Sequence, residues 1–316
     1  MKHKLALLTD LLLPALAELH DADAPKPSPT PTRADVAYGS RKRQVLDFWK
    51  APSKGPTPLV FHIHGGGWVA GDKQDVYSHF QLRELLAAGV SVVSINYRFT
   101  QDAKNAGVEP PVQWPMKDAA LALQFVRSNA KQWGFDKERV VVTGGSAGGC
   151  TALWLALHDD LSDPSSTNPI LRESTKPQCA AVHIAQTSLD PKQMRQWTPN
   201  SYYGSHAFGF FDPTNLATRK DYFDEFLERR ARILPWIQKY SPMEHVSPDD
   251  PPIYMSYRRP PSLGRPQKNP THTSNFGVKL KEELDQSDVE CHLVYPGAPE
   301  VKHANATKFL VEYLKP

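Results

Sequence analysis

A serine flanked by glycines follows a run of β-branched residues near the middle of the chain. Residues 140–149 read Val-Val-Val-Thr-Gly-Gly-Ser-Ala-Gly-Gly, which contains the pattern Gly144-x-Ser146-x-Gly148. A nucleophilic serine must project from a sharp turn, and glycines two residues before and after it let neighbouring backbone pass without a Cβ clash. The β-branched run favours a strand before the turn. The residues after it favour a helix, whose first amides would face a developing negative charge. This placement predicts that Ser146 is a catalytic nucleophile.

A second glycine cluster lies at the end of an earlier apolar run. Residues 61–68 read Phe-His-Ile-His-Gly-Gly-Gly-Trp. Three consecutive glycines let the backbone turn its amides into a pocket, where they can donate to the oxyanion of a tetrahedral intermediate. A phosphate-binding loop is disfavoured because no Gly-Lys-Ser/Thr follows. His62 and His64 could contribute to a metal site, but a catalytic zinc needs three protein ligands and the spacing suggests no third. We therefore expect no metal.

Extended and helical segments alternate along most of the chain, which indicates an α/β protein with a mainly parallel sheet covered by helices on both faces. Two further segments, 35–38 and 44–49, precede this alternation and are typical of an antiparallel pair. Together they predict an eight-stranded sheet. The other expected strands are 59–63, 90–95, 140–142, 179–185, 253–257 and 289–295. The expected helices are 76–88, 115–133, 147–158, a segment with Phe276, Leu280 and Leu284 on one face, and 304–314.

The chain divides into two parts by composition. Residues 1–33 hold a basic start, an apolar stretch with Ala15-Leu16-Ala17 after it, and a proline-rich linker. This layout is typical of a secretory signal and predicts export to the periplasm or outside the cell, although Asp10 within the apolar stretch is also compatible with an amphipathic helix of a cytoplasmic protein. Residues 34–316 form the expected catalytic domain. Within it, residues 191–250 lack a predicted strand but are rich in aromatic residues, which favours a lid-like insertion.

The composition excludes several classes of partner. A net charge of +3 on 316 residues is too small to indicate nucleic-acid binding, and no segment has the roughly 18 unbroken apolar residues of a membrane span. The three cysteines give no disulfide framework. Nothing in these patterns predicts an oligomeric state.

The two glycine clusters together resemble the hormone-sensitive-lipase-type and the feruloyl- and acetyl-xylan-esterase-like (BD-FAE-like) branch of the α/β-hydrolases. Asn96-Tyr97-Arg98, Trp114-Pro115 with Asp118 in the following helix, and Gly134-Phe135-Asp136 fit the same branch. The likeness covers residues 34–316 and is most specific between 59 and 149. It implies the α/β-hydrolase fold, with Ser146 as nucleophile and the amides of Gly66, Gly67 and Ala147 as the oxyanion hole.

The chain departs from this family where the acid and the base of a triad are expected. The segment after the 253–257 strand holds Arg258 and Arg259 instead of a carboxylate. We therefore expect Asp190, which follows the preceding strand, to be the acid, with Glu300 as the alternative. His303 lies between the last strand and the last helix, so the chain order of the fold makes it the expected base. The remaining histidines, among them His183, His206, His272 and His292, are weaker candidates.

These residues predict a serine carboxylesterase that works through an acyl-enzyme and needs no cofactor. The resemblance favours acetyl or feruloyl esters of carbohydrates, or similar short acyl esters, as substrates. The aromatic residues expected to contact the substrate are Trp68, Tyr97, Trp197 and Tyr203. Two alternatives stay open: an amidase or peptidase of the same fold, such as a formamidase-like enzyme, and a non-catalytic binding protein on a hydrolase scaffold, which the missing acid would explain.

Overall fold

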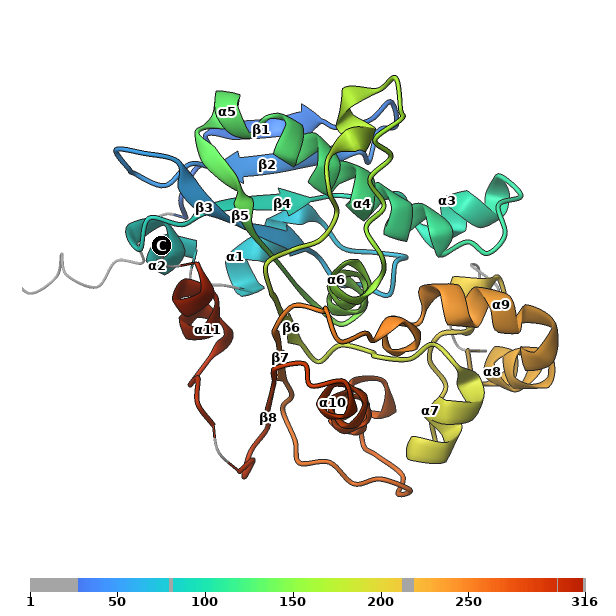
Figure 1. The fold of residues 1–316 in the computed structure, drawn as a ribbon. Coiled ribbons are helices and arrows are strands. Elements are labelled where there is room, and N and C mark those ends of the chain that lie inside the picture. Colours follow the sequence, from blue (N-terminus) through green and yellow to red (C-terminus); the bar gives the residue numbers. More distant parts are fainter. Residues whose placement is uncertain (1–27, 80–81, 212–218, 300, 315–316) are drawn as a thin grey trace, which may run out of the picture.

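A computed structural model describes residues 28–79, 82–211, 219–299 and 301–314. An eight-stranded sheet runs through the molecule in the order β1-β2-β4-β3-β5-β6-β7-β8 (Figure 1). The first two strands pair antiparallel to each other and β2 pairs antiparallel to β4, whereas the remaining neighbours are parallel. The predicted eight-stranded, mainly parallel sheet is therefore confirmed. The strands are β1 (Arg33–Ala37), β2 (Val45–Trp49), β3 (Thr57–Ile63), β4 (Ser91–Ile95), β5 (Phe135–Gly145), β6 (Ala180–His183), β7 (Ile253–Ser256) and β8 (Cys291–Val294).

Helices cover both faces of the sheet, as the alternation predicts. One face carries α4 (Gln113–Ser128), α6 (Ala147–Leu157) and α10 (Asn275–Gln286). The other carries α1 (Val76–His79), α2 (Leu82–Ala87) and α11 (Ala306–Tyr313), as Figure 1 shows. The central strands are buried on both sides, so β3, β4 and the second half of β5 (140–145) show no alternation of buried and exposed residues. The charged residues of β5 (136–139) lie before this buried part.

The helix expected over 115–133 is divided in two. It ends as α4 at Ser128, and a short α5 (Ala130–Trp133) follows. The Asn129 side chain donates a hydrogen bond to the Phe125 carbonyl, which competes with the regular helical bond at that point. Gly134 then closes α5 in a left-handed conformation (φ 72°), and the chain enters β5 directly.

A buried ion pair joins the loop after β4 to α4. Arg98 donates to both carboxylate oxygens of Asp118, at 2.6 and 2.8 Å, and Asp118 is 1% exposed. The Arg98 guanidinium also lies 4.0 Å from the centre of the Trp114 ring. Removing one partner of such a buried pair typically costs about 3–5 kcal/mol, because the other charge is left uncompensated. These residues of the Asn96-Tyr97-Arg98 and Trp114-Pro115 motifs therefore stabilise the fold.

The segment 191–250 stands apart from the sheet. It contains α7 (Pro191–Trp197), η3 (Ser205–Phe208), α8 (Arg219–Glu228), α9 (Arg230–Tyr240) and η5 (Pro242–His245), and no strand among the residues that the structure describes. In Figure 1, α7, α8 and α9 gather on one side of the molecule, beyond α6 and α10. The remaining short helices are α3 (Thr100–Asn105), η1 (Lys73–Asp75), η2 (Pro169–Arg172) and η6 (Pro270–His272).

The predicted signal segment lies outside the described residues, which begin at residue 28. Within the described ranges, no helix has both the length and the apolar character needed to cross a membrane.

Candidate active site

Ser146 occupies the sharp turn between β5 and α6. Its backbone has φ 52° and ψ −124°, a conformation that costs a non-glycine residue about 1–3 kcal/mol and persists only where the surroundings enforce it. The enforcement comes from both neighbours: the Ser146 amide donates to the His183 carbonyl on β6, and its carbonyl accepts from Cys150 one turn into α6. This is the strained strand–turn–helix setting that exposes a nucleophilic hydroxyl.

The glycines around Ser146 are required by close backbone contacts. A Cβ on Gly144 would lie 2.6 Å from the Ile63 carbonyl oxygen, and one on Gly148 would also collide with backbone at the end of β3. On the other side, a Cβ on Gly65 would lie 2.9 Å from the Gly145 carbonyl oxygen. The nucleophile turn and the glycine loop after β3 are therefore packed backbone to backbone, as the sequence reasoning on these glycines requires.

The Ser146 hydroxyl forms a hydrogen bond with a histidine from the loop between β7 and α10. The distance between Ser146 Oγ and Nε2 of His272 is 2.9 Å. His272 ends the short helix η6, and the carbonyl of the residue before it, Thr271, accepts a hydrogen bond from the buried Gln186. The loop is thereby attached to the segment that follows β6. This serine–histidine contact has the geometry of a nucleophile and its general base.

The second ring nitrogen of His272 faces an amide. Its Nδ1 lies 3.0 Å from Nδ2 of Asn269, three residues earlier in the same loop. Burial lowers the pKa of His272, and the positive charge of Arg258 lowers it further. The imidazole is therefore favoured in its neutral form, which is the form that can accept a proton from a serine.

The glycine loop after β3 lines the same cavity as Ser146 and His272. Gly66 and Gly67 both have positive φ values (93° and 62°), and the Gly66 carbonyl accepts hydrogen bonds from the amides of Val69 and Ala70. This tight turn engages the Gly66 carbonyl within the loop itself. Among the described residues, neither the Gly66 nor the Gly67 amide donates a hydrogen bond.

His62 and His64 serve the structure of this region. His62 Nδ1 lies 2.9 Å from Ser94 Oγ on the neighbouring strand. The His64 ring stacks on Tyr97 with centroids 4.2 Å apart, and its Nδ1 lies 2.7 Å from the Gly65 carbonyl oxygen. Burial lowers the pKa of His64 to about 4. The described part of the chain contains no group of three or more histidine, cysteine or acidic residues arranged to bind a metal ion.

The cavity around Ser146 has a volume of about 460 Å³. Much of its wall comes from the 191–250 segment, and the opposite wall comes from the glycine loop and the His272 loop. His206 of that segment lies 2.8 Å from the Gly67 carbonyl oxygen, which connects the two walls. The lining residues are Gly66, Gly67, Val69, Ser146, Ile184, Tyr202, Tyr203, Ser205, His206, Phe211, Tyr222, Asn269, Thr271 and His272.

The model of the BD-FAE family matches residues 46–257, which is more than half of the chain. The chain belongs to the BD-FAE family. This agrees with the resemblance drawn from the two glycine clusters, both of which lie inside the matched range.

Curated relatives of this BD-FAE chain carry ester-hydrolase names. The probable carboxylic ester hydrolase LipM of Mycobacterium tuberculosis is 27% identical over 279 residues, which covers 85% of this chain and 55% of the relative. The versiconal hemiacetal acetate esterase of Dothistroma septosporum is 32% identical over 142 residues, covering 44% of this chain and 40% of the relative. The chain spans about half the length of the curated relatives that it matches most extensively.

Solved structures share the fold. A truncated carbohydrate esterase from gut microbiota superimposes with a TM-score of 0.62 at 20% identity, covering 83% of this chain and 86% of that one. Esterase 2 of Thermogutta terrifontis, phosphonylated by sarin, gives a TM-score of 0.61 at 20% identity, covering 91% and 98%. These similarities support the α/β-hydrolase fold for this BD-FAE chain.

The expectation that His303 faces Ser146 is wrong. His303 lies after the edge strand β8, where its ring packs edge-on against His292 and Phe309. Its Nδ1 is 3.5 Å from a carboxylate oxygen of Glu312 on α11. His303 follows β8, the edge strand three positions from β5, whereas His272 lies in the loop after β7, one strand nearer to β5, and that loop reaches the turn.

Asp190 does not contact His272 either. It caps α7 through the Lys192 amide, and both of its oxygens accept hydrogen bonds from Arg230, at 2.7 and 2.6 Å. Asp190 is 2% exposed, so its carboxylate is already fully engaged. Although Asp190 follows β6 closely in sequence, the chain first runs through the buried segment 185–189, and Asp190 does not line the cavity of Ser146. Glu300, the alternative acid, lies outside the described residues.

Of the four aromatic residues expected to contact substrate, only Tyr203 lines the cavity of Ser146. Trp68 is fully buried and donates to Thr151 inside the core. Tyr97 is also fully buried and donates to the carbonyls of His64 and Gly65, so it supports the glycine loop from behind. Trp197 packs edge-on against Phe276 of α10. The rings of these three residues fill the core around the site, so their role is structural.

The sequence placed His272 among the weaker candidate bases, behind His303, and gave no indication of Asn269. Chain order favoured His303, and Arg258 and Arg259 stand where the family resemblance implies an acid. A usable signal was present: the loop runs to Pro270-Thr271-His272 directly before α10, so its end must return to the edge of the sheet where the carboxyl ends of the parallel strands meet.

Proposed function

We propose that this chain is a serine hydrolase of carboxylic esters, with Ser146 as nucleophile and His272 as general base, and that its substrates are short acyl esters of carbohydrates. The observation that carries the proposal is the 2.9 Å contact between Ser146 Oγ and His272 Nε2 at a strained turn inside a cavity. A binding protein on the same scaffold would need neither the strained serine nor its alignment with a neutral imidazole.

The reaction follows from this geometry. Ser146 Oγ attacks the ester carbonyl carbon while His272 Nε2 takes the hydroxyl proton. The tetrahedral intermediate collapses, the C–O bond to the alcohol breaks, and His272 gives the proton to the leaving oxygen. Water then attacks the acyl-enzyme with His272 again as base, which releases the acid and restores the Ser146 hydroxyl.

The oxyanion formed in both steps needs donors beside Ser146. We assign this role to the amides of Gly66, Gly67 and Ala147. Gly66 and Gly67 line the cavity, and Ala147 follows Ser146 as the first residue of α6, where backbone amides have no acceptor within the helix. Removing one such donor typically costs a factor of about 10²–10³ in turnover.

Asn269 takes the place of the missing acid. For His272 to act as base, Nε2 must accept and Nδ1 must carry the proton, so the group facing Nδ1 must be an acceptor. A half-turn of the Asn269 amide puts its oxygen where Nδ2 lies, 3.0 Å from Nδ1, and the two amide ends are alike in shape. A neutral amide then fixes the ring and its tautomer, as asparagine does in cysteine–histidine–asparagine triads.

The substrate class is supported by the cavity and by the relatives. A volume of about 460 Å³ suits a short acyl group with part of its alcohol, and the tyrosines Tyr202, Tyr203 and Tyr222 offer apolar faces with polar ends. Structural relatives include an acetyl ester-xyloside bifunctional hydrolase from Caldicellulosiruptor lactoaceticus and a Thermogutta terrifontis esterase with propionate bound. An acetyl group on a sugar fits both observations, and a feruloyl group is supported by the family resemblance alone.

The test is a substrate panel combined with active-site labelling. Wild type should hydrolyse p-nitrophenyl acetate and acetylated xylooligosaccharides and should react with a fluorophosphonate probe, and Ser146→Ala should lose all three reactions while keeping its melting temperature. An acetanilide in the panel separates an esterase from an amidase. Wild-type protein that neither turns over any ester nor takes up the probe would refute the proposal.

A further inference from the structure

Ile184 is the first residue after β6, and its backbone is strained. Its φ is 46°, in the left-handed region, where a β-branched residue is a genuine outlier. Such a conformation persists only where the surroundings enforce it, and it occurs most often at functional sites. Ile184 also lines the cavity that holds Ser146. The strain is therefore located in the wall of the proposed active site.

One peptide unit joins Ile184 to the nucleophile turn. Its carbonyl, that of His183, accepts a hydrogen bond from the Ser146 amide at 3.0 Å. Its N–H, that of Ile184, donates to the Ser256 carbonyl on β7 at 2.8 Å. The peptide is held at both ends, so Ile184 cannot turn away from the cavity without breaking a bond to the nucleophile turn or to β7.

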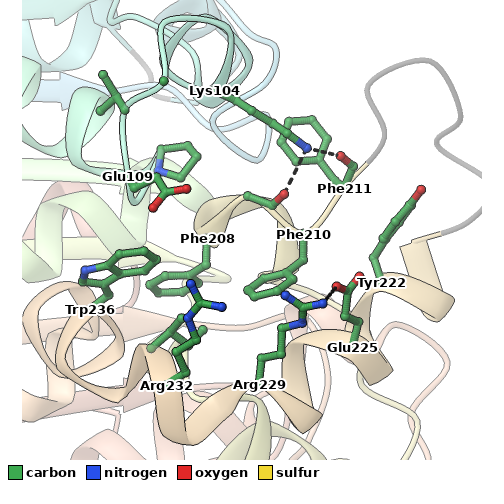
Figure 2. Close-up of a pocket in the computed structure, with 15 residues that line it drawn as sticks. Lys104, Glu109, Phe208, Phe210, Phe211, Tyr222, Glu225, Arg229, Arg232 and Trp236 are labelled. Atoms are coloured by element: carbon green, nitrogen blue, oxygen red, sulfur yellow. Dashed lines mark hydrogen bonds and ion pairs between the residues drawn. The ribbon is translucent and has the colours of Figure 1, made fainter.

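The opposite part of the wall comes from the insertion and has space behind it. Phe211 and Tyr222 line the cavity of Ser146, and both also line a neighbouring cavity of about 470 Å³ between the insertion and the α3–α4 connection, where Figure 2 labels their side chains. A side chain can move into an adjoining cavity at little cost, whereas a close-packed one resists displacement. Ile184 packs against the hydrophobic core, so it forms the firmer part of the wall.

The substituents of the reacting carbon fit different sides of the Ser146 turn. The oxyanion must face the glycine loop after β3, and the leaving oxygen must lie near His272, which gives it a proton. Ile184 follows β6, which flanks β5 on the side away from β3. Its side chain offers only C–H groups, so an apolar acyl chain gains from contact with it, whereas sugar hydroxyls would lose water without gaining a hydrogen bond. These points favour contact between Ile184 and the acyl chain.

We propose that Ile184 is a specificity-determining residue that limits the length of the acyl group, and that its strained backbone keeps the side chain in the cavity. An acetyl group fits in front of the isoleucine, and each added methylene meets its branched side chain. This inference rests on the proposed ester hydrolysis. It narrows the acyl group to acetyl and similarly small groups, and it leaves the choice of alcohol to the insertion.

A series of p-nitrophenyl esters from acetate to hexanoate tests the limit on the acyl group. For wild type, kcat/KM should fall as the acyl chain lengthens. Ile184→Ala removes the branched part of the side chain, so the ratio of kcat/KM for butyrate to that for acetate should rise about tenfold or more, because one methylene in a pocket is worth a factor of about 10–200. Ile170→Ala is the matched control: Ile170 is partly exposed like Ile184 but lies in η2, and the variant should keep the wild-type ratio.

Thermal unfolding tests the strain without turnover. Where φ is negative, glycine destabilises a protein relative to alanine, because glycine loses more conformational freedom on folding. Where φ is positive the order reverses, since alanine is strained there. Ile184→Gly should therefore melt about 2 °C above Ile184→Ala, whereas Ile170→Gly should melt below Ile170→Ala.

The outcomes separate this inference from the proposed function. Wild-type acyl preference in Ile184→Ala would overturn the limit on the acyl group, and so would a change that follows the alcohol in a series of acetates instead of the acyl chain. If Ile184→Gly melts below Ile184→Ala, the strained backbone does not hold the side chain. Wild type that hydrolyses no ester of the series would instead refute the proposed function, and the melting comparison would still report the strain.

Discussion

Replacing Asn269 by aspartate tests the unusual orienting group directly. The substitution puts a carboxylate about where the amide lies, 3.0 Å from Nδ1 of His272. Asn269 is exposed, so a water-like dielectric applies, and two unit charges at this distance then interact by about 1.4 kcal/mol. This interaction stabilises the imidazolium and should raise the pKa of His272 by about one unit.

The assay is the pH dependence of kcat/KM for p-nitrophenyl acetate. A general base must be neutral, so activity falls as the pH drops through its pKa, and Asn269→Asp should move this acid limb upward by about one unit. Above the limb, turnover should equal or exceed that of wild type because the carboxylate also orients the ring. Asn269→Ala adds no charge, so its limb should stay in place while turnover drops about tenfold with the lost hydrogen bond. An unmoved limb in Asn269→Asp, with full turnover in Asn269→Ala, would refute the role of Asn269.

Three further outcomes are expected. His272→Ala should reduce ester hydrolysis by several orders of magnitude, whereas His303→Ala should retain it. Kinetics on the two purified variants, with matched circular dichroism, distinguish them; the reverse result would make His303 the general base. The acid limb of wild type should lie below pH 6.5 because burial and Arg258 lower the pKa of His272, and Arg258→Gln should move it upward in the same pH titration. Asp190→Ala should lower the melting temperature, because it leaves the Arg230 guanidinium without its buried partner. Hydrolysis of p-nitrophenyl acetate by the folded variant should persist. Loss of hydrolysis at an unchanged melting temperature would instead give Asp190 a catalytic role.

The parts of the site that depend on local backbone could be predicted from the sequence. The positions of Gly144 and Gly148 around Ser146 are required by steric contacts with the end of β3, and those contacts follow from the order of strand, turn and helix. The sheet could also be predicted from the sequence, because buried parallel strands are short apolar runs separated by helices of matching length. Local sequence therefore carries enough information to predict the turn that holds Ser146.

The base and the acid could not be found in the same way. Their positions depend on the paths of long connections, and sequence distance from a strand end says little about where such a path returns. Asp190 is only seven residues from the end of β6 yet serves as a helix cap, whereas His272 is 16 residues from the end of β7 and reaches Ser146. The sequence also does not show that the buried carboxylate of Asp190 forms an ion pair with Arg230, 40 residues later on α9.

The arginine at the start of the β7–α10 loop bears on the same question as the missing acid. A carboxylate beside His272 would stabilise the imidazolium of the transition state and would also raise the pKa of the free base. In this chain the charge of Arg258 acts in the opposite direction, and in the arrangement that we propose Asn269 orients the ring without adding charge. The resulting site gives up part of the electrostatic stabilisation of the imidazolium, but its base stays neutral at lower pH. We therefore expect activity to extend into mildly acidic conditions, where a base of ordinary pKa would already be protonated.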